Sequence, residues 1–132
     1  MRDRPGLRSV CIDCADPQGL AAFWAAALGW RVRPYSAEDV AALAAEGLTP
    51  ETDPSVCVDP PDASLPTLWL NKVPEPKVGK VRIHLDVNLA DEKAVDRLID
   101  LGASVVRRLD EWTVMADPEG HEFCAFVAGG TA

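Results

Sequence analysis

The chain has 132 residues, of which 48% are hydrophobic and 26% are charged, a composition typical of a folded globular protein with enough residues for one domain. Thirteen Lys and Arg against 21 Asp and Glu give a formal net charge of −8, and such a surface repels nucleic-acid phosphates and anionic lipid headgroups. No apolar run reaches the roughly 20 residues of a membrane span and the first residues lack the apolar middle of a signal peptide, so we expect a cytoplasmic protein without nucleic-acid or membrane partners.

The first half of the chain predicts a strand, a helix and three further strands. The helix is marked by Asp16 as an N-cap, Pro17 at the first helical position and Gly29 after its last apolar residue. A cap at Ser36 followed by acidic residues predicts a short additional helix, which could line or cover whatever the sheet encloses. The expected elements are strands at 9–15, 30–33, 55–59 and 67–73 and helices at 16–29 and 36–47.

The second half repeats this plan without the additional helix. Residues 74–80 are rich in Pro and Gly and form the linker between the halves. Asp91 is the cap of the second-half helix, and the sequence DPEG at 117–120 suits a tight turn before the last strand. The expected elements are strands at 81–90, 103–107, 112–116 and 121–127, and a helix at 92–102 with Val95, Leu98, Ile99 and Leu101 as its apolar stripe.

Two alignments of the first half with the second half are consistent with the sequence. An offset of 73 places IDC at 12–14 over LDV at 85–87, whereas an offset of 75 pairs the two helix caps, Asp16 and Asp91. Both offsets are odd and both keep polar and apolar faces in register. Each βαβββ unit leaves one sheet face uncovered and needs its twin, so we expect one α+β domain over 1–132, with module one at about 7–73, the linker at 74–80 and module two at about 81–127.

Three stretches carry a resemblance to a known family. AAFWAAALGW after the first strand, RIHLDV at the start of the second half and DPEGHEF before the last strand together resemble the vicinal oxygen chelate superfamily, and within it the glyoxalase-like or bleomycin-resistance-type proteins. The resemblance covers about Leu7 to Val127. It implies two βαβββ modules that form an open, barrel-like mixed sheet with a cleft, often in a homodimer. This superfamily contains lyases, isomerases, dioxygenases, epimerases, thiol transferases and antibiotic-sequestering proteins, so the fold does not select a reaction.

The resemblance also implies four positions that commonly hold His or Glu ligands to a divalent metal, one on the first and one on the last strand of each module. They fall on Ser9, Trp69, His84 and Cys124, and only His84 is a usual ligand. Ser, Trp, His and Cys would not build the oxygen and imidazole sites that Mg²⁺, Mn²⁺, Ni²⁺ and Fe²⁺ prefer. We therefore expect no cofactor, and a divalent metal held through His84 is the alternative.

Strand alternation indicates which side chains face the cleft. In module two the polar set is His84, Asp86 and Asn88, with Ile83, Leu85, Val87 and Leu89 directed inward. A polar sheet face can also simply be wet, but module one repeats the pattern, and converging polar groups are typical of a ligand pocket. His121 is expected to be a solvent-exposed turn residue. The remaining cleft-facing residues are Ser9, Cys11 and Asp13 on the first strand, and Glu122, Cys124 and Phe126 on the last.

Several of these residues could carry chemistry. His84 and Cys124 could act as base and nucleophile, although a buried cysteine is more often inert packing. Glu122 with His84 could hold a metal or act as a general base. Cys11 and Cys14 form a C-x-x-C, but residues three apart on a strand point to opposite faces, which favours two small buried hydrophobes over a metal or redox pair.

The tryptophans favour ligand binding. Trp24 and Trp30 fit the core, whereas Trp69 replaces a metal ligand with a stacking surface for a flat or cationic molecule, in agreement with the acidic chain. The favoured function is therefore metal-independent binding of a small aromatic or cationic molecule; the alternatives are a metal-dependent lyase, isomerase or dioxygenase, and a purely structural or dimerisation role. The catalytic candidates are His84, Glu122 and Cys124, and the ligand-binding candidates are Ser9, Cys11, Asp13, Trp69, Asp86 and Phe126.

Overall fold

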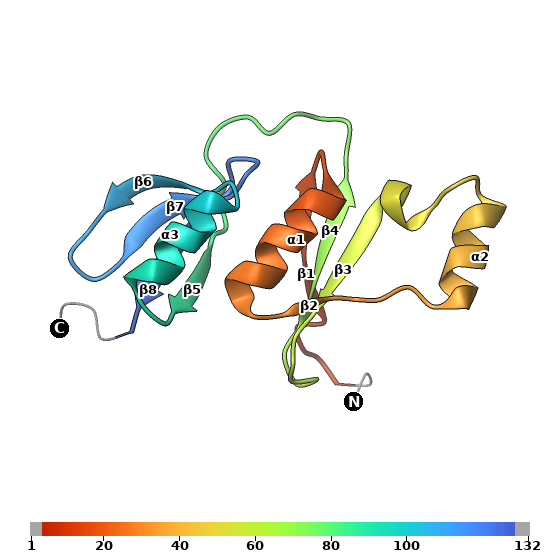
Figure 1. Cartoon of the computed structure of the whole chain (residues 1–132), viewed down its shortest axis with the longest axis horizontal. Helices are drawn as coiled ribbons and strands as arrows, with labels where there is room; N and C mark the ends of the chain where they lie inside the picture. The colour runs from red at the N-terminus through yellow and green to blue at the C-terminus, as the bar shows by residue number, and fades with distance from the viewer. Residues whose placement is uncertain (1–3, 129–132) are drawn as a thin grey trace.

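The computed structural model describes residues 4–128, which fold into two βαβββ modules (Figure 1). The predicted α+β class and the duplicated plan are confirmed. None of the helices in the described residues has the length and apolarity that a membrane crossing needs. Module one contains β1 (Ser9–Cys14), α1 (Pro17–Leu28), β2 (Arg31–Val32), α2 (Ala37–Ala45), the 3₁₀ turn η1 (Pro50–Thr52), β3 (Ser55–Asp59) and β4 (Thr67–Lys72); module two contains β5 (Leu85–Leu89), α3 (Glu92–Asp100), β6 (Ser104–Arg108), β7 (Thr113–Ala116) and β8 (Glu122–Val127).

Each module forms its own four-stranded mixed sheet, in the order β1-β4-β3-β2 and β5-β8-β7-β6. In both sheets the first strand of the module runs parallel to its last strand. This pairing places Cys11 next to Trp69 in the first sheet and Asp86 next to Cys124 in the second. The residues predicted for the cleft therefore lie on neighbouring strands within each module.

The helix caps are those that the sequence predicts. Asp16 accepts a hydrogen bond from the Gly19 amide at 3.1 Å, and Asp91 accepts one from the Ala94 amide at 2.9 Å. The two helices begin at Pro17 and Glu92, an offset of 75, but α1 has 12 residues and α3 has nine. Helix α3 is three residues shorter, but Leu101 separates it from Gly102 whereas Gly29 follows α1 directly, so the two glycines are 73 apart.

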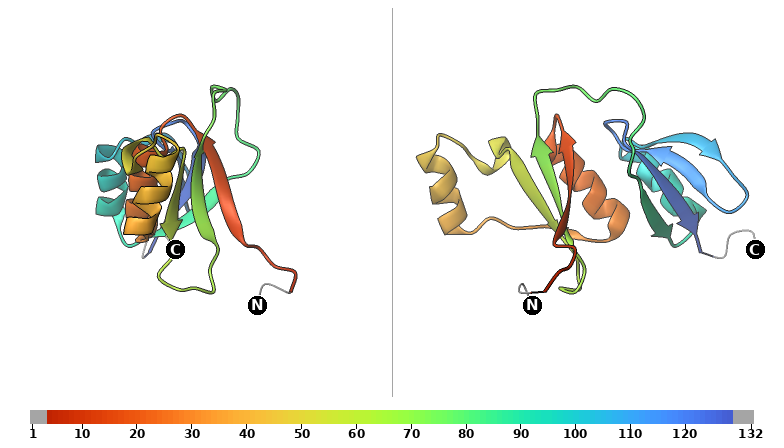
Figure 2. Two further views of the ribbon diagram at one scale, coloured as in Figure 1. Left: turned by 90° about the vertical axis from the view of Figure 1, so that its right-hand side faces the viewer. Right: turned by 180° about the vertical axis from the view of Figure 1, so that it is seen from behind.

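One apolar core joins the two modules. Helix α1 covers the first sheet and also packs against β5 and α3. Trp24 of α1 meets Phe123 of β8 edge to face, with ring centroids 5.1 Å apart, and Phe23 packs against both rings. Figure 2 shows α1 and α3 on the same side of the two sheets, so the strands are in front of both helices when the molecule is seen from behind.

The turn before β8 ties module two to module one. Asp117 is 3% exposed, and its carboxylate accepts hydrogen bonds from Trp24 Nε1 at 3.0 Å and from His121 Nδ1 at 2.9 Å. The other ring nitrogen of His121 lies 3.1 Å from the carbonyl oxygen of Asp13 on β1. Because both ring nitrogens face acceptors, the geometry favours the doubly protonated imidazolium. The prediction of a solvent-exposed His121 is wrong, since its side chain is only 14% exposed.

Glu119 makes the second tie between the modules. Its two carboxylate oxygens accept hydrogen bonds from the backbone amides of Ala15 and Asp16, at 2.7 and 2.8 Å. These amides lie in the turn between β1 and α1, so Glu119 satisfies donors that would otherwise face solvent. Residues 117–121 (D-P-E-G-H) therefore connect the two modules through hydrogen bonds, and we call this stretch the clasp. This structural role accounts for its clustered polar residues.

Strand β5 is shorter than predicted. It begins at Leu85, not at residue 81, and Ile83 is 83% exposed instead of buried. Residues 73–84 cross between the modules (Figure 1), so the alternating pattern continues where no neighbouring strand pairs with it. In α3 the predicted apolar stripe is correct for Val95 and Leu98 but wrong for Ile99 and Leu101, which are exposed, because the nine-residue helix buries only a narrow face.

Candidate functional site

The largest cluster of predicted site residues lies in module two, in a groove of about 610 Å³ that we call the His84 groove. Strands β5 and β8 supply its polar side, and the connecting segment supplies Lys80. Trp112 and Phe126 form its apolar wall, with stacked rings whose centroids are 5.8 Å apart. The groove is lined chiefly by His84, Asp86, Arg107, Trp112, Cys124 and Phe126.

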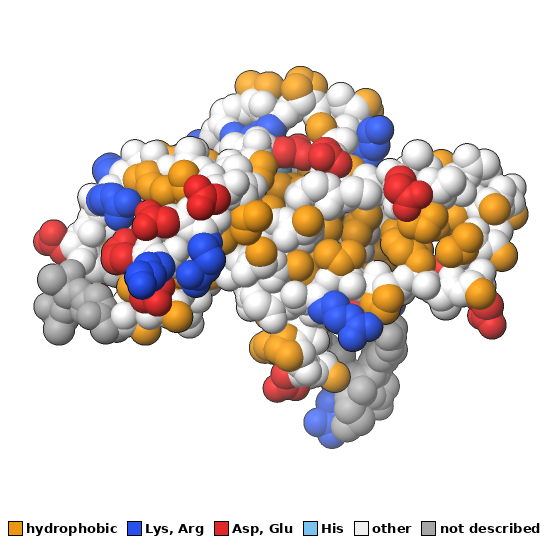
Figure 3. Space-filling model, viewed as in Figure 1, with side chains coloured by type: hydrophobic (Ala, Val, Ile, Leu, Met, Phe, Trp, Pro, Cys, Tyr) orange, Lys and Arg blue, Asp and Glu red, His pale blue; other side chains and the backbone are white. Residues whose placement is uncertain are grey.

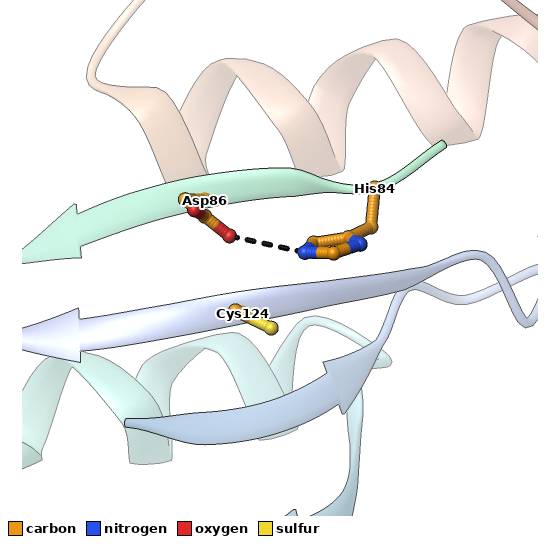
Figure 4. Close-up of side chains that lie close together, drawn as sticks. All are labelled: His84, Asp86 and Cys124. Carbon is orange, nitrogen blue, oxygen red and sulfur yellow. Dashed lines mark ion pairs between the residues drawn. The ribbon is translucent and has the colours of Figure 1, made fainter. Parts of the chain in front are cut away.

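His84, Asp86 and Cys124 point toward one another within this groove (Figure 4). His84 Nε2 lies 3.3 Å from Asp86 Oδ1, and the imidazole, carboxylate and thiol groups each offer one ligand atom within 4.8 Å of the others. The His84 and Asp86 side chains are 54% and 61% exposed, so both can rotate, whereas Cys124 is half-buried on β8. The arrangement brings three metal-ligating side chain types together at the mouth of the groove.

The electrostatics of the groove weaken two of the catalytic candidates. Burial raises the pKa of the Cys124 thiol, and the nearby carboxylates of Asp86 and Glu122 raise it further, so the thiol is protonated and a poor nucleophile at neutral pH. Lys80 forms an ion pair with Glu122 and, through this hydrogen bond, lowers the pKa of that carboxyl group. A carboxylate held ionised by an ammonium group is a weak general base.

A second hollow, of about 640 Å³, lies where the two modules meet under the connecting segment; we call it the junction hollow. Its lining includes polar residues of β1 and β8 and the residue immediately before β5. His84 and Glu122 border both this hollow and the His84 groove. From module one the predicted site residues in its lining are Cys11 and Asp13.

The Trp69 pocket is the third hollow, about 270 Å³ in volume, and lies between α2 and the first sheet. The Arg33 guanidinium lies over the Trp69 ring, 5.5 Å from its centroid. Asp59 holds Arg33 through two hydrogen bonds of 2.9 and 2.7 Å, and the arginine in turn lowers the pKa of Asp59. Trp69 therefore stacks on a cation, as predicted for its ligand, but the cation belongs to the chain itself.

Acidic residues dominate the rest of this pocket. Asp39 and Glu46 reach it from the α2 region, and Asp53 accepts a hydrogen bond from the Tyr35 hydroxyl at 2.7 Å. Burial raises the pKa of Tyr35, and the hydrogen bond to Asp53 adds to this effect. Three carboxylates against one guanidinium make the pocket electronegative. The predicted role of the additional helix, lining what the sheet encloses, agrees with this geometry.

The usual four-ligand metal site does not fit these residues. Trp69 lines a pocket that shares no residue with the His84 groove, and an indole offers no lone pair to a metal. Ser9, at the start of β1, lies outside the linings of all three hollows. Of the four positions, only His84 and Cys124 come together, and both belong to module two.

The first two cysteines lie on opposite faces of β1, as the strand geometry predicts. Cys14 is buried and donates a hydrogen bond through Sγ to the Asn71 carbonyl oxygen at 3.6 Å. Burial, with further contributions from surrounding carboxylates, raises its pKa to about 12. Cys11 is exposed, so the prediction of two buried small hydrophobes is correct for Cys14 and wrong for Cys11.

Two charged residues of the site escape sequence reasoning. Arg33 and Lys80 occupy a strand end and the connecting segment, where basic residues ordinarily face solvent. Their partners Asp59 and Glu122 are 26 and 42 residues away in the chain. Nothing local in the sequence indicates such pairs. The one available signal is an acidic residue that faces a candidate pocket, since it predicts a basic partner nearby.

Comparisons with known proteins agree on the family. The family model described as a glyoxalase-like domain matches residues 9–126. A glyoxalase/bleomycin resistance protein/dioxygenase family enzyme from Burkholderia phytofirmans has a similar structure, with a TM-score of 0.62, 16% identity and coverage of 93% of this chain and 98% of the other. The fosfomycin resistance protein FosX from Mesorhizobium loti has a TM-score of 0.65 at 12% identity, with coverage of 93% and 91%. No curated protein matches the sequence.

Proposed function

Because the chain belongs to the glyoxalase-like family, we propose that it is a small-molecule-binding protein of the glyoxalase and bleomycin-resistance type that does not use the usual four-ligand metal site. Its ligand is a small aromatic or cationic molecule. The Trp69 pocket carries this proposal, since an indole that already stacks on the Arg33 guanidinium, surrounded by Asp39, Glu46 and Asp53, suits a planar cation. Ligand and Arg33 would compete for the same ring.

We also propose that the complete cleft forms between two copies of the chain. Trp69 and His84 lie in separate hollows, so a single ligand would contact both only if module one of one chain faced module two of another. The connecting segment has apolar side chains that support such contact: Val78 and Ile83 are more than four-fifths exposed, and Figure 3 shows hydrophobic atoms along this segment at the top of the view. Association would bury them.

Aromatic cations are expected to raise the melting temperature of the protein. Proflavine and ethidium, with bleomycin as a larger probe, would be screened by thermal shift, and the acidic pocket should favour them over the anionic fosfomycin and naphthalene sulfonate. Trp69→Ala should abolish the shift because it removes the stacking surface. A Kd weakened by about 10-fold or more, from roughly 1.4 kcal/mol of lost stacking, is the expected result in titration.

Trp30→Phe provides the matched control, because Trp30 is a partly exposed tryptophan that lines neither the Trp69 pocket nor the His84 groove. If none of the cations shifts the melting temperature, or if Trp69→Ala leaves the shift intact, the stacking proposal fails. A larger shift with fosfomycin than with the cations would contradict the proposed preference of the pocket for cationic ligands.

A mixed dimer tests the two-chain cleft. Trp69→Ala and His84→Ala chains with different affinity tags would be co-expressed and the doubly tagged species purified. A cleft shared between chains leaves one intact site per mixed dimer, so one bound proflavine per dimer is expected where wild type binds two. Each variant alone should bind proflavine about 10-fold or more weakly than wild type at both sites. Light scattering that gives a monomer, or a mixed dimer that binds no proflavine, would contradict the shared cleft.

The alternative of a metal-dependent lyase, isomerase or dioxygenase stays a prediction. It requires a metal site that Ser9 and Trp69 do not provide. The cluster in the His84 groove is the feature that favours it, because three side chains of metal-ligating types meet there.

A further inference from the structure

We propose that His84, Asp86 and Cys124 form a zinc site that lies entirely within module two. This site differs from the four-position set because it uses Asp86 and needs nothing from module one. The two strands that carry Asp86 and Cys124 are neighbours, and the register pairs these residues directly. His84 comes immediately before β5 and projects over the same face (Figure 4). The zinc site does not depend on the proposed aromatic ligand.

The distances allow the three groups to bind one ion. Zn²⁺ bonds of 2.0–2.3 Å place tetrahedral ligand atoms about 3.3–3.8 Å apart. His84 Nε2 and Asp86 Oδ1 already lie 3.3 Å apart. The full set of ligand atoms lies within 4.8 Å, so closure needs a shortening of about 1 Å, which rotation of the two exposed side chains can supply.

The donor types select the metal. One imidazole, one carboxylate and one thiol match the nitrogen, oxygen and sulfur set that suits Zn²⁺ and its substitute Co²⁺. Mg²⁺ and Mn²⁺ prefer oxygen-rich sites and bind thiolates poorly. On binding, the Sγ–H bond of Cys124 breaks, its proton leaves to the buffer and a metal–sulfur bond forms, with no change of oxidation state. Three protein ligands leave a fourth position open to the groove.

The surroundings limit where a metal can sit. Glu122, which also borders the groove, is engaged by Lys80, so the ammonium group occupies the carboxylate that would compete with Asp86. On the other side, the stacked Trp112 and Phe126 form an apolar wall. The three ligand residues and this aromatic surface therefore line the same groove, where a small oxygen- or nitrogen-bearing molecule would be close to the metal.

Co²⁺ and Zn²⁺ titration of the full chain, stripped of metal, tests the site. We expect one Co²⁺ per chain with a thiolate-to-cobalt charge-transfer band, which Zn²⁺ displaces at one equivalent. Cys124→Ser should abolish the band, and His84→Ala and Asp86→Asn should each weaken Zn²⁺ binding by more than about 10-fold in competition with a chromogenic chelator. Mg²⁺ and Mn²⁺ should not compete.

Matched variants distinguish this site from metal binding elsewhere on the chain. Cys11→Ser removes an exposed thiol of module one and should leave the band intact, as should Ser9→Ala and Trp69→Phe at the other family positions. Circular dichroism would show that each variant is folded. The zinc site is ruled out if Co²⁺ gives no charge-transfer band, if Cys124→Ser retains it, or if Trp69→Phe removes it. Proflavine titration of the same variants is a separate readout, so failure of the zinc proposal can be distinguished from failure of the ligand proposal.

Discussion

Replacing Asp117 by alanine is expected to lower the free energy of unfolding by about 3–5 kcal/mol. Its carboxylate has no exposed side chain surface and accepts hydrogen bonds from Trp24, from the His121 ring and from the backbone amides of Glu119 and His121. The substitution leaves His121 Nδ1 and the Trp24 indole N–H without the carboxylate that they contact, and each such group bears a desolvation cost. Urea denaturation followed by circular dichroism measures the change.

Two further variants define what the carboxylate contributes. Asp117→Asn keeps the size and one acceptor but removes the charge, so its effect should lie between those of wild type and Asp117→Ala. Glu111→Gln neutralises an exposed acid in the loop between β6 and β7 and should change stability by less than about 0.5 kcal/mol. If Asp117→Ala costs no more than Glu111→Gln, the clasp between the modules does not stabilise the fold.

The ion pair between Asp117 and His121 makes the stability of the clasp depend on pH, and the two pKa shifts determine the sign of this dependence. Burial alone would raise the pKa of Asp117, but hydrogen bonds from His121 and Trp24 outweigh it, so the pKa lies below 3.8; the bond to Asp117 raises the pKa of His121 above 6.5. The carboxylate contribution is lost as pH falls below 3.8, and the imidazolium contribution is lost as pH rises above 6.5. Stability of wild type relative to His121→Gln should therefore fall from pH 6.5 upward.

The modules and their caps were predictable because their signals are local. Asp16, Pro17 and Gly29 lie within a few residues of the helix ends that they define, and strand alternation needs only a short window. The same window misleads at Ile83, where alternation continues into the connecting segment. Burial there depends on whether another strand lies alongside, and that is a property of the tertiary structure.

The candidate site was predictable only in part, for a related physical reason. His84 and Cys124 share a face because alternation along two parallel neighbours sets both side chains, so pattern reasoning brings them together correctly. The separation of Trp69 from them depends on how two modules pack, which no periodicity encodes. His121 illustrates the same limit, because one of its two partners, Asp13, is 108 residues away in the chain. Its low exposure follows from the packing of the two modules and not from its local sequence.

Phe123→Ala is expected to cost about 3–5 kcal/mol, the range for removing a phenyl group from a well-packed core. Phe123 has no exposed surface and meets both Phe23 and Trp24 of α1, so the cavity would open between the modules. Because Trp24 belongs to module one and Phe123 to module two, tryptophan fluorescence and circular dichroism should show one shared transition in wild type. Separate transitions for the two modules in the variant would indicate that this contact couples them.

Phe126→Ala is the matched control, because it removes the same side chain from the opposite face of β8. Phe126 is half-buried and stacks on Trp112 alone among the aromatic rings of residues 4–128, so its loss should cost about 0.5–1.5 kcal/mol. The two-residue periodicity of β8 thus predicts a large effect at 123 and a small one at 126. Equal costs at the two positions would mean that the apolar core between β8 and the helices does not lie on the Phe123 face of the strand.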